Sequence, residues 1–185
     1  VTMSYLEGFY YRPRVDKDLL AKYSGGLMAL SGCTSSEISK LFIAGDEKGA
    51  KAKILQYQQI FGKDDFYLEI QRHQFGEFAK AHQEGSEIYN DLSRMHKSEE
   101  AILKGAQKFS KELNIPIVAT NDLHYIHSDD AQAQDAIVCI QTGKNIQDIK
   151  RLRMIDSPTY YLRSGQEMAE IFKDIPEAVS NTTKF

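Results

Sequence analysis

The sequence of 185 residues lacks the features that mark several large classes of protein. It contains two cysteines, Cys33 and Cys139, which are too few for a disulfide scaffold, so a reduced, cytoplasmic setting is expected. No segment approaches the roughly 20 consecutive apolar residues that a membrane-spanning helix needs. Nor does the sequence begin with a charged leader and an apolar core, as a secretory signal does. These absences argue against a membrane partner and against secretion.

Charge of one sign is also lacking. The formal net charge is −3, from 23 Lys and Arg and 26 Asp and Glu residues. A protein that binds nucleic acid tightly on its own usually carries a strong overall basic field, and this chain does not. The one local basic cluster, Lys144 with Lys150, Arg151 and Arg153, is interpreted as a solvated loop face.

Several catalytic motifs are missing as well. We find no glycine-rich phosphate loop, no Walker-type lysine and no nucleophile elbow. A Ser–His–Asp triad stays open as an alternative, although no serine lies in the strained setting of a nucleophile. Internal repeats and low-complexity segments are not apparent. The 42% hydrophobic and 26% charged residues are typical of one ordinary globular domain.

What is present is an alternation of short apolar runs with helical periodicity. This pattern of βα units predicts an α/β fold with parallel strands and surrounding helices, in a sheet or a barrel. Strands are expected at residues 27–30, 66–71 and 115–120, with at best a short one at 160–162. Helices are expected at residues 16–23, from about 36, from about 46 to 61, between 75 and 114 as two helices meeting near Gly85 or His96, at 128–141, at 164–173, and from Pro176.

The most informative stretch is residues 115–125, IPIVATNDLHY. If its strand continues through Asp122, the side chains of Asp122 and His124 leave the same face, because residues i and i+2 of a strand do so. Such a pair could provide two metal ligands, or a carboxylate that orients a base. The alternative is that Asn121 and Asp122 simply turn the chain and that His124 is exposed.

Three groups follow the ends of predicted strands: Cys33, the stretch from Glu69 to His73, and Asp122 with His124. In a parallel α/β fold these ends meet in space, and a thiolate, an imidazole and a carboxylate suit zinc or another divalent transition metal. Simpler interpretations exist for each. Cys33 could be a small buried residue in a turn, Glu69 could be solvated or paired with Arg72, and His73 could be a surface loop residue.

Other candidates have plainer interpretations. Cys139 is expected in the core, His82 and His96 on exposed helix surface, and His127 in a loop. In the helix expected at residues 128–141, the side chains expected to face inward are Ala133, Ala136, Ile137 and Ile140.

Five stretches resemble the bacterial DNA polymerase III alpha-subunit family of replicative polymerases, in the same order along nearly the whole chain. They are GFYYRPRVDKDLLAKYSGGLMALSGC, FYLEIQRH, IPIVATNDLHY, VCIQTGKN and DIPEAVSNT. They are most similar to the later part of that family's N-terminal polymerase-and-histidinol-phosphatase (PHP) domain. The resemblance implies a portion of a distorted (β/α)7 barrel, formed by residues 1–185 as a single-domain fragment, with about 164–185 leading toward the polymerase core. Residues 82–98 look like an insertion.

The resemblance also implies a metal site. PHP domains of this family bind a cluster of three metal ions through up to nine ligands. Cys33, Asp122 and His124 match metal ligands of the family, while Glu69 and His73 are neighbours of the site. The remaining ligands would precede Val1, so the chain alone is expected not to complete the cluster. Zinc or manganese is the expected metal, with magnesium for polymerisation in the full-length protein.

The implied function is DNA-directed DNA synthesis in chromosomal replication, with a metal-dependent 3′–5′ exonuclease in the PHP domain. DNA, a proofreading subunit and a sliding clamp are the implied partners. The alternative is a catalytically silent scaffold that stabilises the polymerase and docks the proofreading subunit. A free-standing PHP phosphatase is less favoured, because IQTGKN and DIPEAVSNT are polymerase-type segments. The isolated fragment is expected to be inactive and, through its exposed sheet edge, to self-associate.

Overall fold

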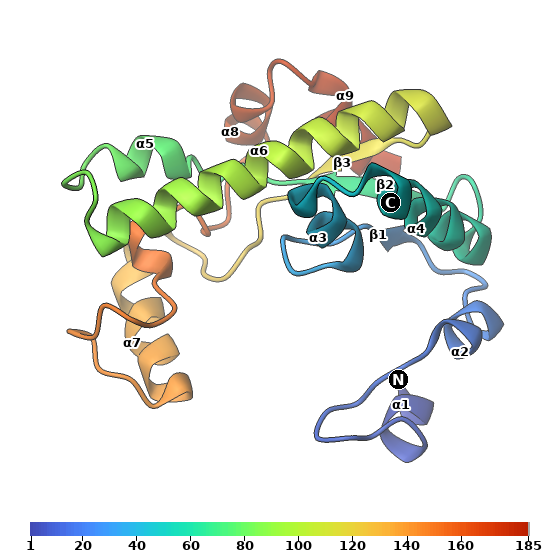
Figure 1. The fold of residues 1–185 in the computed structure, drawn as a ribbon, viewed down its shortest axis with the longest axis horizontal. Coiled ribbons are helices and arrows are strands. Elements are labelled where there is room, and N and C mark those ends of the chain that lie inside the picture. The colour runs from blue at the N-terminus through green and yellow to red at the C-terminus, as the bar shows by residue number, and fades with distance from the viewer. Residues whose placement is uncertain (185) are drawn as a thin grey trace.

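The computed structural model describes residues 1–184 and has an α/β fold built on three parallel strands (Figure 1). The elements are α1 (Thr2–Leu6), α2 (Lys17–Lys22), β1 (Ala29–Leu30), α3 (Glu37–Ala44), α4 (Glu47–Phe61), β2 (Phe66–Ile70), α5 (Phe75–Ala79), α6 (Glu87–Leu113), β3 (Ile117–Ala119), α7 (Ala131–Thr142), α8 (Gly165–Ile171) and α9 (Pro176–Ser180), with short 3₁₀ helices η1 (Ser128–Asp130), η2 (Met154–Asp156) and η3 (Asn181–Lys184). Among the described residues, every helix is too short or too polar to cross a membrane.

The sheet has the strand order β1-β2-β3, so β2 lies in the middle. Ala29 pairs with Phe66 on one side of β2, and Leu68 pairs with Ile117 on the other. All residues of β2 and β3 are buried, as expected for parallel strands that are covered on both faces. β1 is shorter than expected, and Leu30 is 37% exposed because it lies at the sheet edge. The α/β class is therefore confirmed, while the (β/α)7 barrel stays a prediction.

The larger hydrophobic core lies between the sheet and the helices α3, α4, α6, α8 and α9. Phe109 of α6 is 2% exposed, and its ring stacks on that of Phe42 with centroids 5.9 Å apart. The fully buried members are Ile38, Ala50, Ile54, Phe66, Leu68, Ile70, Ala106, Phe109, Ile115, Ile117, Ala119, Phe172, Ile175 and Ala178.

A second, smaller core lies beside the first, and α6 extends across both. It joins α5, the first half of α6, the loop after β3 and the start of α7, and its buried members are Phe75, Ala79, Leu92, Tyr125, Ala131 and Tyr160. Figure 1 shows α7 projecting from the end of α6 that carries α5, while α1 and α2 lie toward the opposite side. The cavity described below is lined by residues of this second core.

Capping residues and a glycine mark several of the helix ends. Ser36 and Ser86 accept hydrogen bonds from the main chain of α3 and α6, as N-caps do. The two helices expected between residues 75 and 114 are separated near Gly85, where φ is +83°, and α6 continues without a break through His96. Helix α1 was not expected, because its sequence has no capping signal and Val1 makes no side-chain cap.

The inward face predicted for α7 is wrong. Ile137 and Ile140 are 49% and 81% exposed. The residues of this helix that are buried are Ala131, Asp135, Val138 and Cys139, which confirms the core position expected for Cys139. The reason is an ion pair that apolar periodicity cannot reveal: the helix turns its carboxylate inward toward an arginine.

That arginine is Arg151, and its side chain is 1% exposed. Its Nη1 and Nη2 donate to the two carboxylate oxygens of Asp135 at 2.6 and 2.7 Å. Arg153 is likewise paired, with Asp156. The expectation that the basic cluster forms a solvated face is therefore wrong for these two arginines, and it holds for Lys144 and Lys150, which are exposed.

Because Phe109 fills the larger core, we expect Phe109→Ala to lower the free energy of unfolding by about 3–5 kcal/mol. Phe9→Ala is the matched control: Phe9 is 58% exposed, so its loss should change stability by less than about 0.5 kcal/mol. Urea unfolding of both variants measures the difference. Equal losses would contradict the assignment of the core.

Candidate functional site

Three chemically active residues each lie three positions beyond the end of a strand. Cys33 follows β1, His73 follows β2 and Asp122 follows β3 at this spacing. Each loop turns sharply through the left-handed region, at Gly32 (φ +82°), at Gln74 (φ +57°) and at Asp122 itself (φ +48°). Since parallel strands end at the same edge of a sheet, these loops lie together, at the edge where α/β folds usually place their sites.

A cavity of about 330 Å³ opens at this edge. Cys33, Glu69, His73 and Asp122 all line it, so it brings together four of the five residues selected from the sequence. Helix α6 closes the cavity from the other side with Arg94, Met95, Ser98, Glu99, Ile102 and Leu103. That Cys33, Asp122 and His124 bind metal, with Glu69 and His73 as neighbours of the site, stays a prediction.

Asp122 and His124 lie side by side, although not for the reason expected. β3 ends at Ala119 and Asp122 has a left-handed backbone, so the strand does not continue through the pair. Nevertheless, Nε2 of His124 lies 3.4 Å from Oδ1 of Asp122. The main-chain N–H of His124 donates to the carbonyl of Tyr160 at 2.8 Å, and its ring meets the Tyr160 ring edge-on. The chain does turn at Asn121 and Asp122, as the alternative interpretation predicts, and the carboxylate of Asp122 still lies beside the imidazole of His124.

Asn121 ties this loop to the segment that follows η2. Its Nδ2 donates to the carbonyls of Thr159 and Tyr161 at 3.3 and 2.5 Å. Tyr161 in turn forms an isolated parallel bridge with Tyr125. This single bridge stands in place of the short strand expected at residues 160–162. The Oδ1 of Asn121 is buried and has no hydrogen-bond partner among the described residues, so one oxygen beside the pair is left without a donor.

Cys33 is half-buried and is not a core residue. Its Sγ lies 3.2 Å from the hydroxyl of Ser35, in the loop between β1 and α3. The thiol therefore lines the cavity rather than packing as a small hydrophobe.

Both simpler interpretations of Glu69 are wrong. It is 9% exposed because it lies on the central strand. Its carboxylate accepts hydrogen bonds from Thr120 Oγ1 and from Gln71 Nε2. Arg72 pairs instead with Asp174, whose carboxylate holds the pKa of that guanidinium above its usual value.

His73 is a buried residue and not a surface loop residue, since it is only 4% exposed. Its ring stacks on Tyr160 with centroids 4.3 Å apart, and its Nδ1 lies 3.2 Å from Thr159 Oγ1. Ser157 Oγ donates to its carbonyl at 2.7 Å. Burial, which disfavours the charged imidazolium, lowers the pKa of His73 to about 4.

Sequence reasoning missed Glu99, which α6 brings to the cavity. Its Oε1 accepts the main-chain N–H of His73 at 2.7 Å, and burial raises the pKa of this carboxyl to about 7. A signal was present: Glu99 continues toward the N-terminus the helical stripe of Ile102, Ala106 and Phe109. A carboxylate on the buried stripe of a helix is unusual and indicates a candidate site.

The donors around the cavity match a metal site in type but form only part of one. A carboxylate, an imidazole and a thiol, with an amide oxygen nearby, suit a divalent transition metal. Within residues 1–184, however, no three His, Cys, Asp or Glu side chains approach closely enough to hold an ion. Asp122 and His124 are adjacent, so the residues present would supply part of a coordination sphere.

Comparison with known proteins now shows what the chain is similar to. The family model of the PHP domain matches residues 1–73. Curated proteins named DNA polymerase III subunit alpha are 42% identical in Borreliella burgdorferi, 40% in Chlamydia pneumoniae and 34% in Treponema pallidum. These matches cover 98–99% of the chain. Over nearly its whole length, the chain is similar to a segment of DNA polymerase III alpha subunits.

The resemblance read from the sequence is thereby confirmed. The chain spans 14–15% of the length of these alpha subunits. Cys33, Glu69 and His73 lie within the part that the PHP model matches, whereas Asp122 and His124 lie beyond it and are covered by the alpha-subunit matches.

His73 and Glu99 should give opposing pH dependences of stability. Because the pKa of His73 falls from 6.5 to about 4 on folding, the unfolded chain binds more protons between these values, and this contribution to stability rises with pH there. Because the pKa of Glu99 rises from 4.5 to about 7, the folded chain binds more protons in that window, and this contribution falls as pH rises. The two offset each other over most of pH 4–7.

Substituting one of these two titratable groups should reveal the pH dependence of stability that the other contributes. In metal-free protein, Glu99→Gln should make stability rise from pH 4 to 6.5, and His73→Gln should make it fall from pH 4.5 to 7. The free energy of unfolding should change by at most roughly 3 kcal/mol in each case, since a shift of one pKa unit corresponds to about 1.4 kcal/mol. Urea midpoints across this range measure it. Glu100→Gln, at a neighbouring solvated carboxylate, is the control, and parental profiles in all three variants would refute the prediction.

Proposed function

We propose that this chain is the later part of the PHP domain in a DNA polymerase III alpha subunit and that it contributes to a divalent-metal site for phosphodiester hydrolysis. The proposed reaction is removal of nucleotides from the 3′ end of a primer, as proofreading during DNA synthesis. The observation that carries the proposal is the adjacent Asp122 and His124, whose reactive atoms lie 3.4 Å apart beside the cavity that Cys33 lines. Residues 164–185 would lead toward the polymerase core.

In this proposal Asp122, His124 and Cys33 hold zinc or manganese together with ligands from elsewhere in the alpha subunit. The metal would polarise a phosphoryl oxygen and acidify a water. Tyr160 positions the loop of the pair, by accepting the N–H of His124 and by contacting its ring. The ring of His73 stacks on that of Tyr160, and its Nδ1 lies beside the hydroxyl of Thr159. His73, Thr159 and Tyr160 are all buried.

The wider activity is proposed from the relatives, which are named as polymerase subunits. DNA-directed DNA synthesis, dependent on magnesium, would take place in another part of the alpha subunit. DNA and other replicase subunits, such as a proofreading subunit and a sliding clamp, would be the partners.

One observation favours a second candidate function, a structural scaffold. Among residues 1–184, two donors approach each other where a metal site needs three or more. If the alpha subunit supplies no further ligands, the same buried cluster would only brace the polymerase and dock a separate proofreading subunit.

The deciding experiment uses the full-length alpha subunit with its polymerase carboxylates disabled and a primer with a 3′ mismatch. Asp122→Asn and His124→Ala should each reduce metal-dependent trimming by roughly 100-fold or more and lower the bound metal content. His127→Ala is the matched control, because His127 lies exposed in the same loop, and it should trim normally.

The scaffold alternative predicts a different outcome. If the parent does not trim, and the same two substitutions in an alpha subunit with intact polymerase carboxylates leave polymerisation normal but lower the melting temperature, the exonuclease proposal fails and the scaffold is correct.

A further inference from the structure

Glu99 is a carboxyl that the proposed metal site does not use, although it borders the same cavity as Cys33 and Asp122. Its Oε1 is held by the main-chain N–H of His73 at 2.7 Å. Its Oε2 makes no hydrogen bond among residues 1–184, and it is not one of the fully buried polar atoms that lack a partner. Solvent therefore reaches this oxygen, so one half of the carboxyl is fixed and the other half is free to react.

The carboxyl of Glu99 lies close to the candidate metal ligands. Tyr160 is 6% exposed, and its ring meets that of His124 edge-on with centroids 5.6 Å apart. Burial, together with the nearby charges of Asp122 and Glu99, raises the pKa of the Tyr160 hydroxyl. Because both carboxylates act on the same hydroxyl, they lie near one another at a single small cavity. A phosphodiester bound beside Asp122 would therefore lie close to Glu99.

The surroundings of Glu99 allow it to carry a proton near neutral pH. Burial raises the pKa of this carboxyl to about 7. The N–H of His73 and the guanidinium groups of Arg72 and Arg163 act in the opposite direction, and burial outweighs them. An acid whose pKa lies near the working pH is the most effective proton donor.

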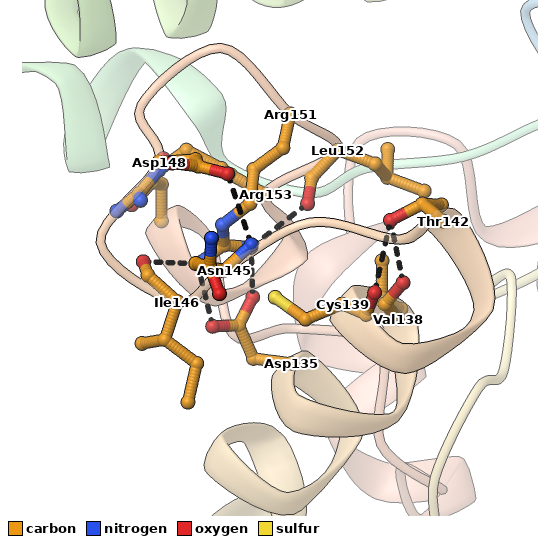
Figure 2. Close-up of polar contacts among 11 residues, drawn as sticks. Asp135, Val138, Cys139, Thr142, Asn145, Ile146, Asp148, Arg151, Leu152 and Arg153 are labelled. Atoms are coloured by element: carbon orange, nitrogen blue, oxygen red, sulfur yellow. Dashed lines mark hydrogen bonds and ion pairs between the residues drawn. The ribbon is translucent and has the colours of Figure 1, made fainter.

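A second wall of the cavity is also fixed. Leu152 and Arg153 line the cavity. Figure 2 shows that Arg151, the residue before them, donates to both carboxylate oxygens of Asp135 and to the carbonyl of Leu152. Arg153 is itself paired with Asp156. The loop and α6 are thus both held in place before any ligand binds, as the surroundings of a catalytic group need to be.

We propose that Glu99 is the general acid of the exonuclease reaction and donates its proton from Oε2 to the leaving 3′ oxygen of the primer. This inference rests on the proposed function. In this step an oxygen of water forms a bond to phosphorus, and the bond from phosphorus to the 3′ oxygen breaks. The leaving oxygen keeps the electron pair of that bond and takes the proton of Glu99. The water gives up a proton to the solvent, which later returns one to Glu99. The products are a nucleoside 5′-monophosphate and a shortened primer.

The test compares two substrates in the full-length alpha subunit with its polymerase carboxylates disabled. Trimming of a mismatched primer releases an alkoxide, a strong base that needs a proton. The p-nitrophenyl ester of thymidine 5′-monophosphate releases p-nitrophenolate, a weak base that does not. Glu99→Gln should slow trimming by roughly 100-fold or more and leave hydrolysis of the ester near the parental rate. Asp122→Asn should abolish both reactions, and Glu100→Gln, at a solvated neighbour, should change neither.

Bound metal content is measured on the same samples, and Glu99→Gln should retain the parental amount because Glu99 is not a proposed ligand. Equal loss of both reactions, or loss of the metal, would make Glu99 a structural support for His73 and overturn the inference. Normal trimming by Glu99→Gln would mean that the reaction needs no acid at this position. A parent that cleaves neither substrate would instead refute the exonuclease proposal itself, and the inference with it.

Discussion

Main-chain hydrogen bonds on the two sides of β2 position the loops that carry the candidate site. The N–H of Ser31 donates to the carbonyl of Tyr67 at 2.9 Å, and the N–H of Thr120 donates to the carbonyl of Ile70 at 3.0 Å. The first bond fixes the exit of β1 against the first half of β2, and the second fixes the exit of β3 beside the exit of β2. The side chains repeat the arrangement, because Ser31 Oγ accepts the N–H of Glu69 while Glu69 accepts the hydroxyl of Thr120. A shift of either outer strand would separate Cys33 from Asp122.

Burial at this junction has the same physical effect on an acid and on a base, and it shifts their pKa values in opposite directions. Desolvation disfavours the ionised form of each group, so His73 favours the neutral imidazole and Glu99 favours the neutral carboxyl. The N–H of His73 partly counters this for Glu99, since a hydrogen bond to a carboxylate stabilises its charge. The side chains of Asp122 and His124 are each 36% exposed, and a charged pair is less costly in such a solvated position.

The parts of the fold that local chemistry determines could be predicted from the sequence. Capping residues such as Ser36 and Ser86, and apolar runs such as residues 66–70, define elements regardless of what surrounds them. The pairing of Asp122 with His124 was also predicted, but by strand periodicity, whereas a left-handed turn produces it. Glu99 and the inward face of α7 were missed because both depend on partners distant in sequence, His73 for the first and Arg151 for the second.

The position of the cavity follows from the two-core architecture. Helix α6 has 27 residues and is about 40 Å long at 1.5 Å per residue, so it can contact both cores. Leu92 packs in the smaller core, Phe109 packs in the larger one, and Glu99 lies between them at the cavity. Side chains from two separately packed layers rarely fill the junction between them completely, which is why ligand sites so often lie at such boundaries. Arg94, Met95 and Ser98 of α6 line the cavity together with Glu99, so the helix that contacts both cores also forms one wall of the candidate site.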